Sequence, residues 1–596
     1  MQEASSASPQ FRVVVFSSLP AARLRHVLWR LTTDLPEIKI AGVVYELRRP
    51  PLARLERIRR ALGFLPDRAF RRFVLHRACR RLKKLAIAVL DRLLHALHAC
   101  PRHPNGAPPT IDSLAREYLE LGARFHVTND LHAPESLAFV RGLQSNLGIV
   151  FGTGILQPTL FEIPSSGCVN IHQHKLPTYR GSGEPGLWEL RDGCSEQTVT
   201  IHRIVAAVDA GPVLAERSFR IDPYDTLSSI GLKAQLVSID LLVDVLRAET
   251  AGDRLELPQP NVAKLHKGLL PHALFTIARD IRKKRGPYLP RPARPLPKLV
   301  ARCALLPLAA MRNRRHRRAK SYPVVVLFHH VITDKPKFMG LATEQFARQV
   351  RYLKKHYRIA SLDRAVAMLE AREVDAPTVV LTFDDGYAEN FLCARAVAEA
   401  EDVPVTYFIC TQKVQAEDEF EHDWDRGEHG FRAMSWQQIA YLAKHGATIG
   451  SHTRTHFDCG GTDPLALSRE IVGSRDELAS QLGGVPSFFA FPYGYPKHIS
   501  AVAERIARET YLYVFSAHGG VNRIGIKPPC VLYRASQPDT LLELELLMQS
   551  LLEIHPPNPE RVEIASSNGE VDASSMFCPR DEGDAHPSRE TTASTP

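Results

Sequence analysis

Three residues in the first half of the chain carry the side chains that acyl transfer to an amine requires. Asn170 and His172 are two positions apart, so in a β-strand both side chains would lie on the same face. Asp209 follows a later strand-like run. An amide and an imidazolium can stabilise a tetrahedral oxyanion, while a carboxylate orients the imidazole and helps to remove the amine proton. We therefore expect an acyl-transfer site at these three residues.

Four residues in the second half have the types and order of a metal-dependent hydrolase. Asp384 and Asp385 follow a hydrophobic run, where catalytic groups are expected at the carboxyl end of a barrel strand. Adjacent carboxylates point in different directions, so one can bind a metal while the other acts as a base. His452 and His456 are expected to converge on one side of a helical turn and to bind one cation with Asp385. Such a site leaves positions open for water, whose pKa the metal lowers.

The elements that must position these residues follow an α/β pattern. Strand-like runs at 12–16, 38–44, 148–151 and 198–202 alternate with helical text, and a second α/β region opens at 324–328. Five prolines between 287 and 297 disfavour a helix there and indicate a linker. The predicted organisation is a flexible N-terminus (1–10), a first α/β domain (11–250), a basic linker (251–320), a second α/β domain (321–554) and a disordered tail (555–596).

The charge of the chain is concentrated in two segments. Lys and Arg number 76 against 65 acids, a net charge of +11. Residues 48–103 contain sixteen Lys and Arg against three acids, and residues 282–320 contain fourteen and no acid. Leucines at three- and four-residue spacing predict an amphipathic basic helix in 48–103. This insert could pack on its host domain, adsorb to an anionic membrane surface or bind nucleic acid.

Composition excludes several classes of protein. No apolar run approaches the roughly 18 residues of a membrane-spanning helix, and the start of the chain lacks the basic and apolar regions of a secretory signal. The ten cysteines include no C-x-x-C pair, which argues against a disulfide framework or a structural zinc site. We expect a reduced, cytoplasmic, multidomain protein.

The first α/β region resembles the folate-dependent formyltransferase family, which includes methionyl-tRNA, glycinamide ribonucleotide and nucleotide-sugar formyltransferases. The matching pieces are Asn170-Ile171-His172, Leu176-Pro177-Thr178-Tyr179-Arg180-Gly181, Glu184-Pro185, Thr200-Ile201-His202 and Asp209-Ala210-Gly211-Pro212-Val213. The resemblance implies a Rossmann-like fold, the catalytic trio Asn170, His172 and Asp209, and 10-formyltetrahydrofolate as donor. The folate is then expected near a loop made of Phe151, Gly152, Thr153, Gly154 and Ile155. The chain departs from the family at Gln173-His174-Lys175 and by its basic insert.

The second α/β region resembles the polysaccharide deacetylase family of carbohydrate esterases, from 324 to about 550. The matching pieces are Leu327-Phe328-His329-His330-Val331, Leu381-Thr382-Phe383-Asp384-Asp385-Gly386, Val405-Thr406-Tyr407-Phe408, Ser451-His452-Thr453-Arg454-Thr455-His456, Phe489-Ala490-Phe491-Pro492-Tyr493-Gly494 and Tyr533-Arg534. The resemblance implies a (β/α) barrel-like domain in which Asp384 is the base and Asp385, His452 and His456 bind the metal. It also implies that the Tyr493 N–H helps to bind the oxyanion and that a late histidine is the acid, for which His518 is the candidate. Zinc suits these ligands, and other divalent ions fit as well.

The two resemblances together suggest a bifunctional enzyme that modifies an aminosugar, free or nucleotide-linked, in surface-polysaccharide or lipopolysaccharide synthesis. One half would add a formyl group to an amine and the other would remove an acetyl or formyl group from one. Formyl-folate is cytosolic, so both halves are expected in the cytoplasm, where the two basic segments could hold the protein against the inner membrane face. Two alternatives stay open: a tRNA formyltransferase that uses the basic insert on phosphates, and a deacetylase with a non-catalytic formyltransferase-like tether. Nucleic acid is the less favoured partner.

Overall fold

The computed structural model describes residues 10–47, 109–253, 256–260, 265–266, 305–335, 337, 340–538 and 540–549. The chain divides into a compact unit, 1–554, and a second unit, 555–596, which holds no described residue. Within the first unit we call residues 10–266 the N-terminal half and residues 305–549 the C-terminal half. Residues 1–9 of the predicted N-terminus 1–10, the basic insert 48–103 and the tail 555–596 lie outside the described residues.

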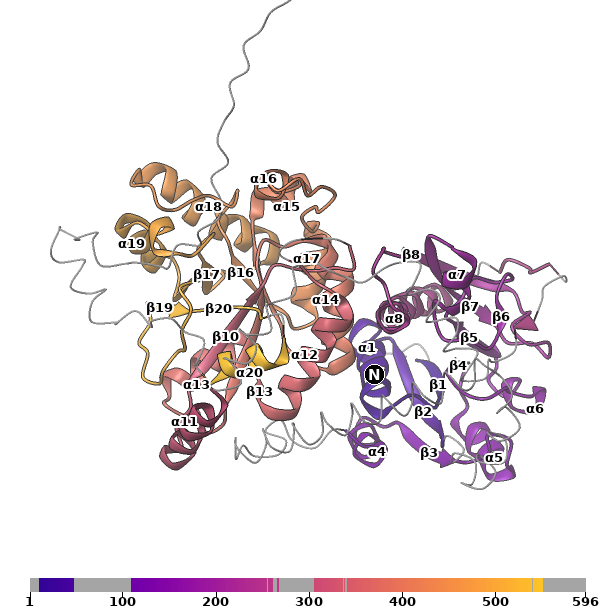
Figure 1. The fold of residues 1–596 in the computed structure, drawn as a ribbon. Helices are drawn as coiled ribbons and strands as arrows, with labels where there is room; N and C mark the ends of the chain where they lie inside the picture. Colours follow the sequence, from indigo (N-terminus) through magenta and orange to yellow (C-terminus); the bar gives the residue numbers. More distant parts are fainter. Residues whose placement is uncertain are drawn as a thin grey trace, which may run out of the picture. The chain divides into compact units, whose positions relative to one another are not determined.

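The N-terminal half is built on a seven-stranded sheet of order β3-β2-β1-β4-β5-β7-β8 (Figure 1). Its strands are β1 (Phe11–Ser17), β2 (Ile38–Glu46), β3 (Arg124–Thr128), β4 (Leu147–Phe151), β5 (Cys168–His172), β7 (Glu196–Arg203) and β8 (Val213–Arg220). The strands β1 to β5 pair in parallel, and β7 and β8 join antiparallel. Its helices are α1 (Ala21–Asp34), α4 (Ile111–Glu120), α5 (Pro134–Leu143), α6 (Pro158–Phe161), α7 (Leu187–Asp192) and α8 (Leu227–Ala251). This is the predicted Rossmann-like α/β fold.

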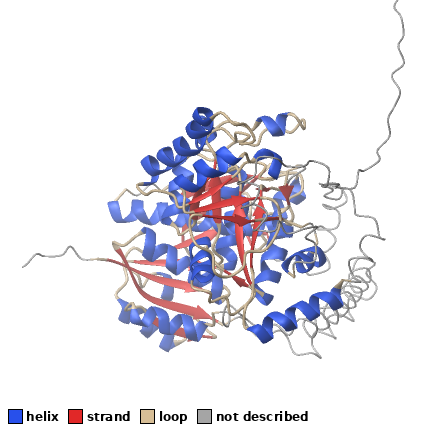
Figure 2. Ribbon diagram, turned by 90° about the vertical axis from the view of Figure 1, so that its left-hand side faces the viewer, coloured by secondary structure: helices blue, strands red, loops and turns tan. Residues whose placement is uncertain are grey.

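The C-terminal half is built on a nine-stranded sheet in which every pairing is parallel, curved into a nearly closed barrel (Figure 2). The strands on its main path are β10 (Val324–His329), β14 (Thr378–Phe383), β15 (Thr406–Ile409), β16 (Thr448–Ser451), β17 (Phe488–Ala490), β18 (Tyr513–Ser516), β19 (Cys530–Tyr533) and β20 (Ala535–Ser536), and β13 (Arg358–Ile359) pairs with β14. Side chains of β10 and β14 are buried along their whole length, as expected for parallel strands covered on both faces. The predicted barrel-like fold is confirmed.

Helices follow most of these strands and cover the barrel. They are α12 (Thr343–His356), α13 (Leu362–Glu370), α14 (Ala388–Glu401), α15 (Thr411–Ala416), α16 (Glu421–Trp424), α17 (Trp436–Lys444), α18 (Pro464–Leu482), α19 (Ala501–Thr510) and α20 (Leu541–Met548), with a 3-10 turn at Pro496–His498. Two short strands, β11 (Val331–Ile332) and β12 (Gly340–Leu341), pair beside β10. No helix among the described residues is both long and apolar enough to cross a bilayer.

Helix α8 belongs to both halves of the unit. It begins at a capping box of Thr226 and Ser229 and ends at Gly252, whose positive φ suits a helix end. Its Ile230 and Ala234 lie in the core of the N-terminal half, whereas Leu232 and Leu236 lie in the core of the C-terminal half. A helix that is apolar on several faces must be buried on several faces, and α8 packs on β7 and β8 as well as on α12 and α14.

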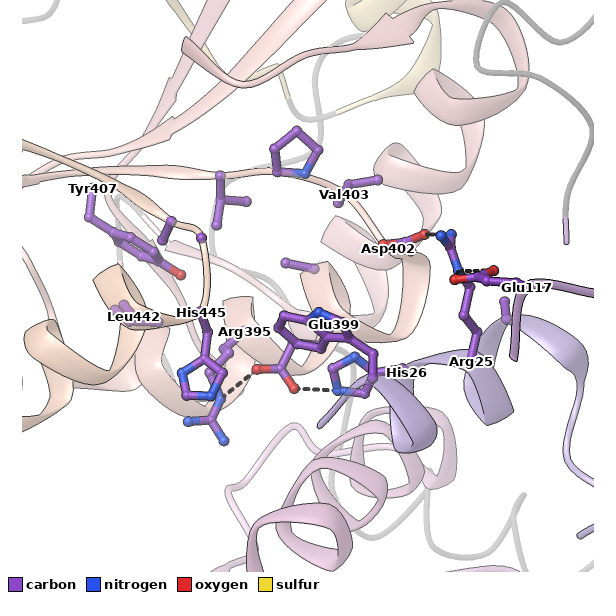
Figure 3. Close-up of a pocket in the computed structure, with 17 residues that line it drawn as sticks. Arg25, His26, Glu117, Arg395, Glu399, Asp402, Val403, Tyr407, Leu442 and His445 are labelled. Atoms are coloured by element: carbon purple, nitrogen blue, oxygen red, sulfur yellow. Dashed lines mark hydrogen bonds and ion pairs between the residues drawn. The ribbon is translucent and has the colours of Figure 1, made fainter. Parts of the chain in front are cut away.

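Buried charges join the halves beside α8. Asp240 of α8 accepts a hydrogen bond from Arg395 of α14, and His26 of α1 lies 2.8 Å from Glu399 of α14. His26, Glu399 and Arg395 line a cavity of about 370 Å³ together with Tyr407, Leu442 and His445 (Figure 3). Residues 403–405, which precede β15, also line the cavity, and none of the predicted site residues does.

Two parts of the predicted linker 251–320 form regular structure instead. The short strand β9 (Leu265–His266) pairs with β6 (Arg180–Gly181), so this part belongs to the N-terminal half. Helix α11 (Leu306–Ala319) lies just before β10. The prolines that argued against a helix lie upstream of α11, where they impose no restriction on it.

The turn that carries Asp209 depends on a glycine. A Cβ atom at Gly211 would lie 2.0 Å from the backbone oxygen of Arg203, so Gly211→Ala must displace backbone. We expect a loss of about 1–3 kcal/mol in the free energy of unfolding. The matched control is Gly231→Ala in α8, where a Cβ meets nothing within 4 Å and helix propensity favours Ala by up to about 1 kcal/mol. Denaturant unfolding of both variants measures the contrast; equal stabilities would contradict it.

Candidate functional sites

The first site lies at the carboxyl end of β5. Asn170 and His172 are both on this strand, and Asp209 is in the turn between β7 and β8 with a positive φ of 50°. The Asp209 carboxylate is 3.5 Å from the Asn170 amide nitrogen through Oδ1 and 3.8 Å from His172 Nδ1 through Oδ2. The Gly181 N–H donates to Asp209 Oδ2 (2.9 Å). The structure therefore brings the three predicted residues together.

Backbone contacts determine which nitrogen of His172 carries the proton. Its Nε2–H donates to the Tyr179 carbonyl oxygen (2.7 Å), so in the neutral ring the lone pair is on Nδ1 and faces Asp209. Burial lowers the pKa of His172 to about 4, although the nearby Asp209 carboxylate opposes this shift. His172 is thus a neutral base near pH 7, with a carboxylate placed to stabilise the cation that proton uptake would produce.

The sequence motif contains His202, but sequence reasoning assigned it no role. His202 is directly opposite Asn170 in the β5–β7 register. Its Nδ1–H donates to the Arg203 carbonyl oxygen (2.8 Å), so its Nε2 can accept from the Asn170 amide (3.1 Å). His202 therefore orients that amide. Burial raises the pKa of Asp209, but His202, His172 and the Gly181 N–H together hold it below its usual value.

The loop predicted to contact folate starts at the end of β4, the strand next to β5. Phe151 is buried as the last residue of β4, and Gly152 has a positive φ of 78°. The Gly154 N–H donates to Glu46 at the end of β2 (2.8 Å), and Ile155 is 72% exposed. Thr153 completes the loop. The carboxyl ends of neighbouring parallel strands form one edge of a sheet, so this loop and the catalytic trio share an edge where α/β folds bind ligands.

The second site lies at the carboxyl ends of β14 and β16. Asp385 is two residues beyond the end of β14, with a positive φ of 70°, and His452 directly follows β16. Asp385 Oδ1 is 3.4 Å from His452 Nε2 and 3.3 Å from His456 Nε2. One ligand atom from each of these three residues lies within 4.8 Å of the others, which is close enough to hold one ion.

The expected helical turn between the two histidines is wrong. Residues 452–458 form a loop after β16, and both Thr453 and His456 have positive φ values of 64° and 65°. An i, i+4 helical pair would require helical φ throughout. The two rings converge because the loop reverses its direction, and their centroids are 5.3 Å apart.

The chemistry of these side chains fits a divalent cation. Both oxygens of Asp385 are buried and neither accepts a hydrogen bond of good geometry from a described residue. The His452 Nδ1–H donates to the Ala490 carbonyl oxygen (2.7 Å), which leaves the Nε2 lone pair directed at Asp385. Burial raises the pKa of Asp385, but His456 and His452 hold it well below its usual value. Two imidazoles and one carboxylate suit zinc and several other divalent ions.

Asp384 has a different partner from the three candidate metal ligands. The buried Arg534 donates to Asp384 Oδ1 (2.5 Å), and the Asp384 N–H donates to the His329 carbonyl oxygen (2.8 Å). Burial lowers the pKa of His329 to about 4, so this histidine is neutral near pH 7. Asp384 therefore stands beside the candidate ligands with one oxygen engaged by arginine, as a proton acceptor would.

The remaining predicted residues border this centre less directly. The ring of Tyr493 is 4.8 Å from that of His456, and Tyr493 has a positive φ of 59°. The Ala517 N–H donates to the Gly494 carbonyl oxygen (2.8 Å), which brings the segment of His518 next to Tyr493. His518 Nε2 is buried without a hydrogen bond among the described residues, and burial lowers the pKa of this histidine. The acid role of His518 stays a prediction.

One histidine beside the centre was missed. His422 of α16 has its Nε2 3.9 Å from Asp385 Oδ2 and 3.0 Å from the Tyr387 hydroxyl, and its ring is 4.6 Å from that of His456. Burial lowers the pKa of His422 to about 3. No spacing signal could reveal it, because a long loop brings α16 back over the end of β14.

Comparisons with known proteins match a part of each half to a different family. Residues 123–246 match the family model described as formyl transferase, and residues 371–512 match the one described as polysaccharide deacetylase. A methionyl-tRNA formyltransferase of Geobacter metallireducens is 34% identical over 178 residues, which are 28% of this chain and 56% of that protein. The chain thus spans about half the length of the curated relatives it matches.

Solved structures of both kinds resemble parts of the chain. IcaB from Ammonifex degensii is 24% identical, covering 38% of this chain and 97% of its own, with a TM-score of 0.33. The formyltransferase PseJ from Anoxybacillus kamchatkensis is 23% identical, covering 27% of this chain and 82% of its own, with a TM-score of 0.23. From the two family matches and the two assembled sites, the chain joins a formyl transferase family domain to a polysaccharide deacetylase family domain.

Proposed function

We propose that this chain formylates the amine of an aminosugar from 10-formyltetrahydrofolate and also removes an N-acyl group from a carbohydrate in a reaction that needs a divalent metal. The observation that carries the proposal is that one chain contains two polar centres, one in each half. One has the amide, imidazole and carboxylate of acyl transfer, and the other has an Asp–His–His cluster beside a second, arginine-bound aspartate. One centre would add an acyl group to an amine, and the other would remove an acyl group from an amine.

In the formyl-transfer reaction, the residues of the trio have separate roles. When bound, 10-formyltetrahydrofolate supplies the formyl group, near the loop 151–155. His172 Nδ1 takes the proton from the attacking amine, and Asp209, 3.8 Å away, stabilises the resulting imidazolium, which would return that proton to the folate nitrogen when its bond to the formyl carbon breaks. The Asn170 amide, oriented by His202, donates to the oxyanion of the tetrahedral intermediate.

In the hydrolytic reaction, Asp385, His452 and His456 would hold the cation. When bound, a divalent ion such as zinc polarises the amide carbonyl and lowers the pKa of water. Asp384 accepts the proton of the attacking water while Arg534 holds the carboxylate in place. The Tyr493 N–H donates to the oxyanion, and His518 is the proposed proton donor to the departing amine.

The substrate we propose is a small aminosugar, free or linked to a nucleotide, used in surface-polysaccharide or lipopolysaccharide synthesis. Deacetylation would expose an amine that the other half then formylates, or hydrolysis would remove the formyl group after a later step. A folate donor places the chemistry in the cytoplasm. Product masses from a panel of acetylated, formylated and free aminosugar nucleotides test the proposal; no turnover by the full chain at either site would refute it.

A tRNA substrate is the second candidate, because the curated relatives named above are methionyl-tRNA formyltransferases. Against it, the described chain beyond the formyltransferase fold leads into the deacetylase-family domain rather than a separate RNA-binding one. Initiator methionyl-tRNA in the same panel separates the two candidates. Formylation of the tRNA with none of any sugar would favour the second.

The two activities should be separable by substitution. His172→Ala removes the proton acceptor and is expected to lower formyl transfer more than about a hundredfold, leaving deacetylation intact. Asp385→Asn removes a metal ligand and should leave formyl transfer intact. It should lower deacetylation by more than the roughly ten- to hundredfold loss that is typical when a residue bonded to a metal ligand is replaced. His126→Ala and Asp375→Asn are matched controls, since His126 bonds to Ser136 and Asp375 to Arg358, away from both sites. Unchanged whole-chain activity of His172→Ala would favour a tethering role for its domain.

The titration of His172 gives a check that needs no substrate. Its pKa of about 4 lies below the value near 6.5 of an unfolded histidine. Between these pH values the unfolded state binds a proton that the folded state does not, so the contribution of His172 to stability is lost as pH falls through this window. In histidine-labelled protein, the NMR signal that disappears in His172→Gln should titrate near pH 4. A midpoint near 6.5 would contradict the buried, neutral imidazole.

We also propose that helix α11 contacts an anionic membrane surface. Arg314 and Arg315 are exposed, Leu308 and Met311 are 49% and 66% exposed, and no acid occurs between 306 and 320. Each cation near such a surface contributes about 1 kcal/mol, so replacing both arginines by Gln should weaken vesicle binding by up to about thirtyfold. The control pair is Arg505 and Arg508 of α19, which are bonded to Glu509 and Glu504. Equal binding of both double variants to phosphatidylserine vesicles would exclude α11.

A further inference from the structure

A buried lysine of the N-terminal half reaches into the C-terminal half. Lys233 on α8 is 0% exposed, and its Nζ lies 2.9 Å from Asp225 Oδ1 and 2.9 Å from Asp334 Oδ2. Asp225 precedes α8, whereas Asp334 follows β11 in the deacetylase-family domain. A buried ammonium is tolerated only where acids surround it, so removing Lys233 would leave Asp334 beside Asp225 without a cation between them.

Asp334 organises the segment in which it lies. Its side chain accepts the Thr343 N–H (3.1 Å) and hydroxyl (2.7 Å) at the start of α12. Its backbone oxygen accepts the Tyr224 N–H (3.0 Å), a second contact from the N-terminal half. The position of Asp334 is therefore determined from both halves at once.

The residues just before Asp334 lead directly to the metal centre. Asn390 of α14 donates to the His330 carbonyl oxygen (2.7 Å) and accepts the Ile332 N–H (2.8 Å). The carbonyl oxygen of the preceding His329 accepts the Asp384 N–H (2.8 Å). Asp334 is only four positions after His330, which adjoins this contact.

Lys337, three positions after Asp334, contacts the loop that contains α16, beside the centre. Lys337 Nζ is 2.5 Å from Asp423 Oδ1 and 3.1 Å from Glu428, both in the loop that contains α16. Asp423 Oδ2 accepts the Tyr387 hydroxyl hydrogen bond (2.9 Å), and the same hydroxyl contacts His422, the histidine 3.9 Å from Asp385. Polar contacts on either side of Asp334 and Lys337 thus reach from Lys233 to the surroundings of Asp385.

We propose that Lys233 of the formyltransferase domain is a positioning residue of the deacetylase centre. By anchoring Asp334 it fixes residues 330–335 and Lys337, and so positions His330 and, through the contact of Lys337 with Asp423, the α16 segment that carries His422. The deacetylase domain is then incomplete without its partner domain, which explains why one helix serves two cores. This inference rests on the proposed hydrolytic function of the C-terminal half.

The test compares two interface contacts on the same helix of the full-length chain. Lys233→Met removes the anchor, while Asp240→Asn weakens the contact with Arg395 of α14, seven residues further along α8. Hydrogen–deuterium exchange of metal-free protein should show faster exchange at 330–337 and 421–425 in Lys233→Met only. The deacetylation kcat of Lys233→Met should fall about tenfold or more, as is typical when residues that support metal ligands are replaced. The kcat of Asp240→Asn should stay within about twofold of wild type.

Two further variants keep the test decisive. Lys233→Met/Asp225→Asn preserves the net charge of the buried cluster in case the single variant does not fold. Lys337→Met should reproduce the kcat loss, and its combination with Lys233→Met should be less than additive, because both act through one segment. Wild-type exchange at 330–337 and unchanged kcat in the folded variants would overturn the proposal. A wild-type chain that deacetylates no sugar would instead refute the proposed function, while the exchange result would still judge the role of Lys233.

Discussion

The arrangement of this chain depends on a charged helix buried between two domains. Helix α8 supplies apolar side chains to both cores, so it cannot be withdrawn from either. Two of its charges therefore meet opposite charges of the C-terminal half, Lys233 with Asp334 and Asp240 with Arg395. Breaking one partner of such a pair leaves an uncompensated buried charge, which costs more than the pair contributes. These ion pairs thus determine how α8 is aligned against the C-terminal half, even where their net contribution to stability is modest.

Both sites follow one construction rule. Most of the predicted site residues lie at the carboxyl ends of parallel strands. Hydrogen bonds to backbone carbonyl oxygens then determine which ring nitrogen of each histidine carries the lone pair. His172 donates to Tyr179, His202 to Arg203, and His452 to Ala490. Each imidazole therefore presents a single lone pair towards a carboxylate or an amide. This preorganisation suits the amide chemistry proposed for both folds, because the groups need no solvent to orient them.

Local signals in the sequence predicted much of this. Asn170 and His172 could be paired because strand periodicity is strict, and Asp384 and Asp385 because they end an unbroken apolar run. The confirmed fold class and family resemblances rest on such motifs. The helical turn at His452 was wrong because i, i+4 spacing does not distinguish a helix from a loop with positive φ values. Lys233 and His422 could not be predicted, since their roles arise from contacts between residues distant along the chain.

The central claim is that one chain carries out two amide reactions of opposite sense on a sugar amine. The most direct measurement is the mass spectrum of an N-acetylated aminosugar nucleotide incubated with the full chain, zinc and 10-formyltetrahydrofolate, with arms lacking folate or containing a chelator. The account predicts the free amine without folate, the formamide with folate, and unchanged substrate with the chelator. Intact acetylated sugar in every arm across the panel, with free amines also left unformylated, would contradict it.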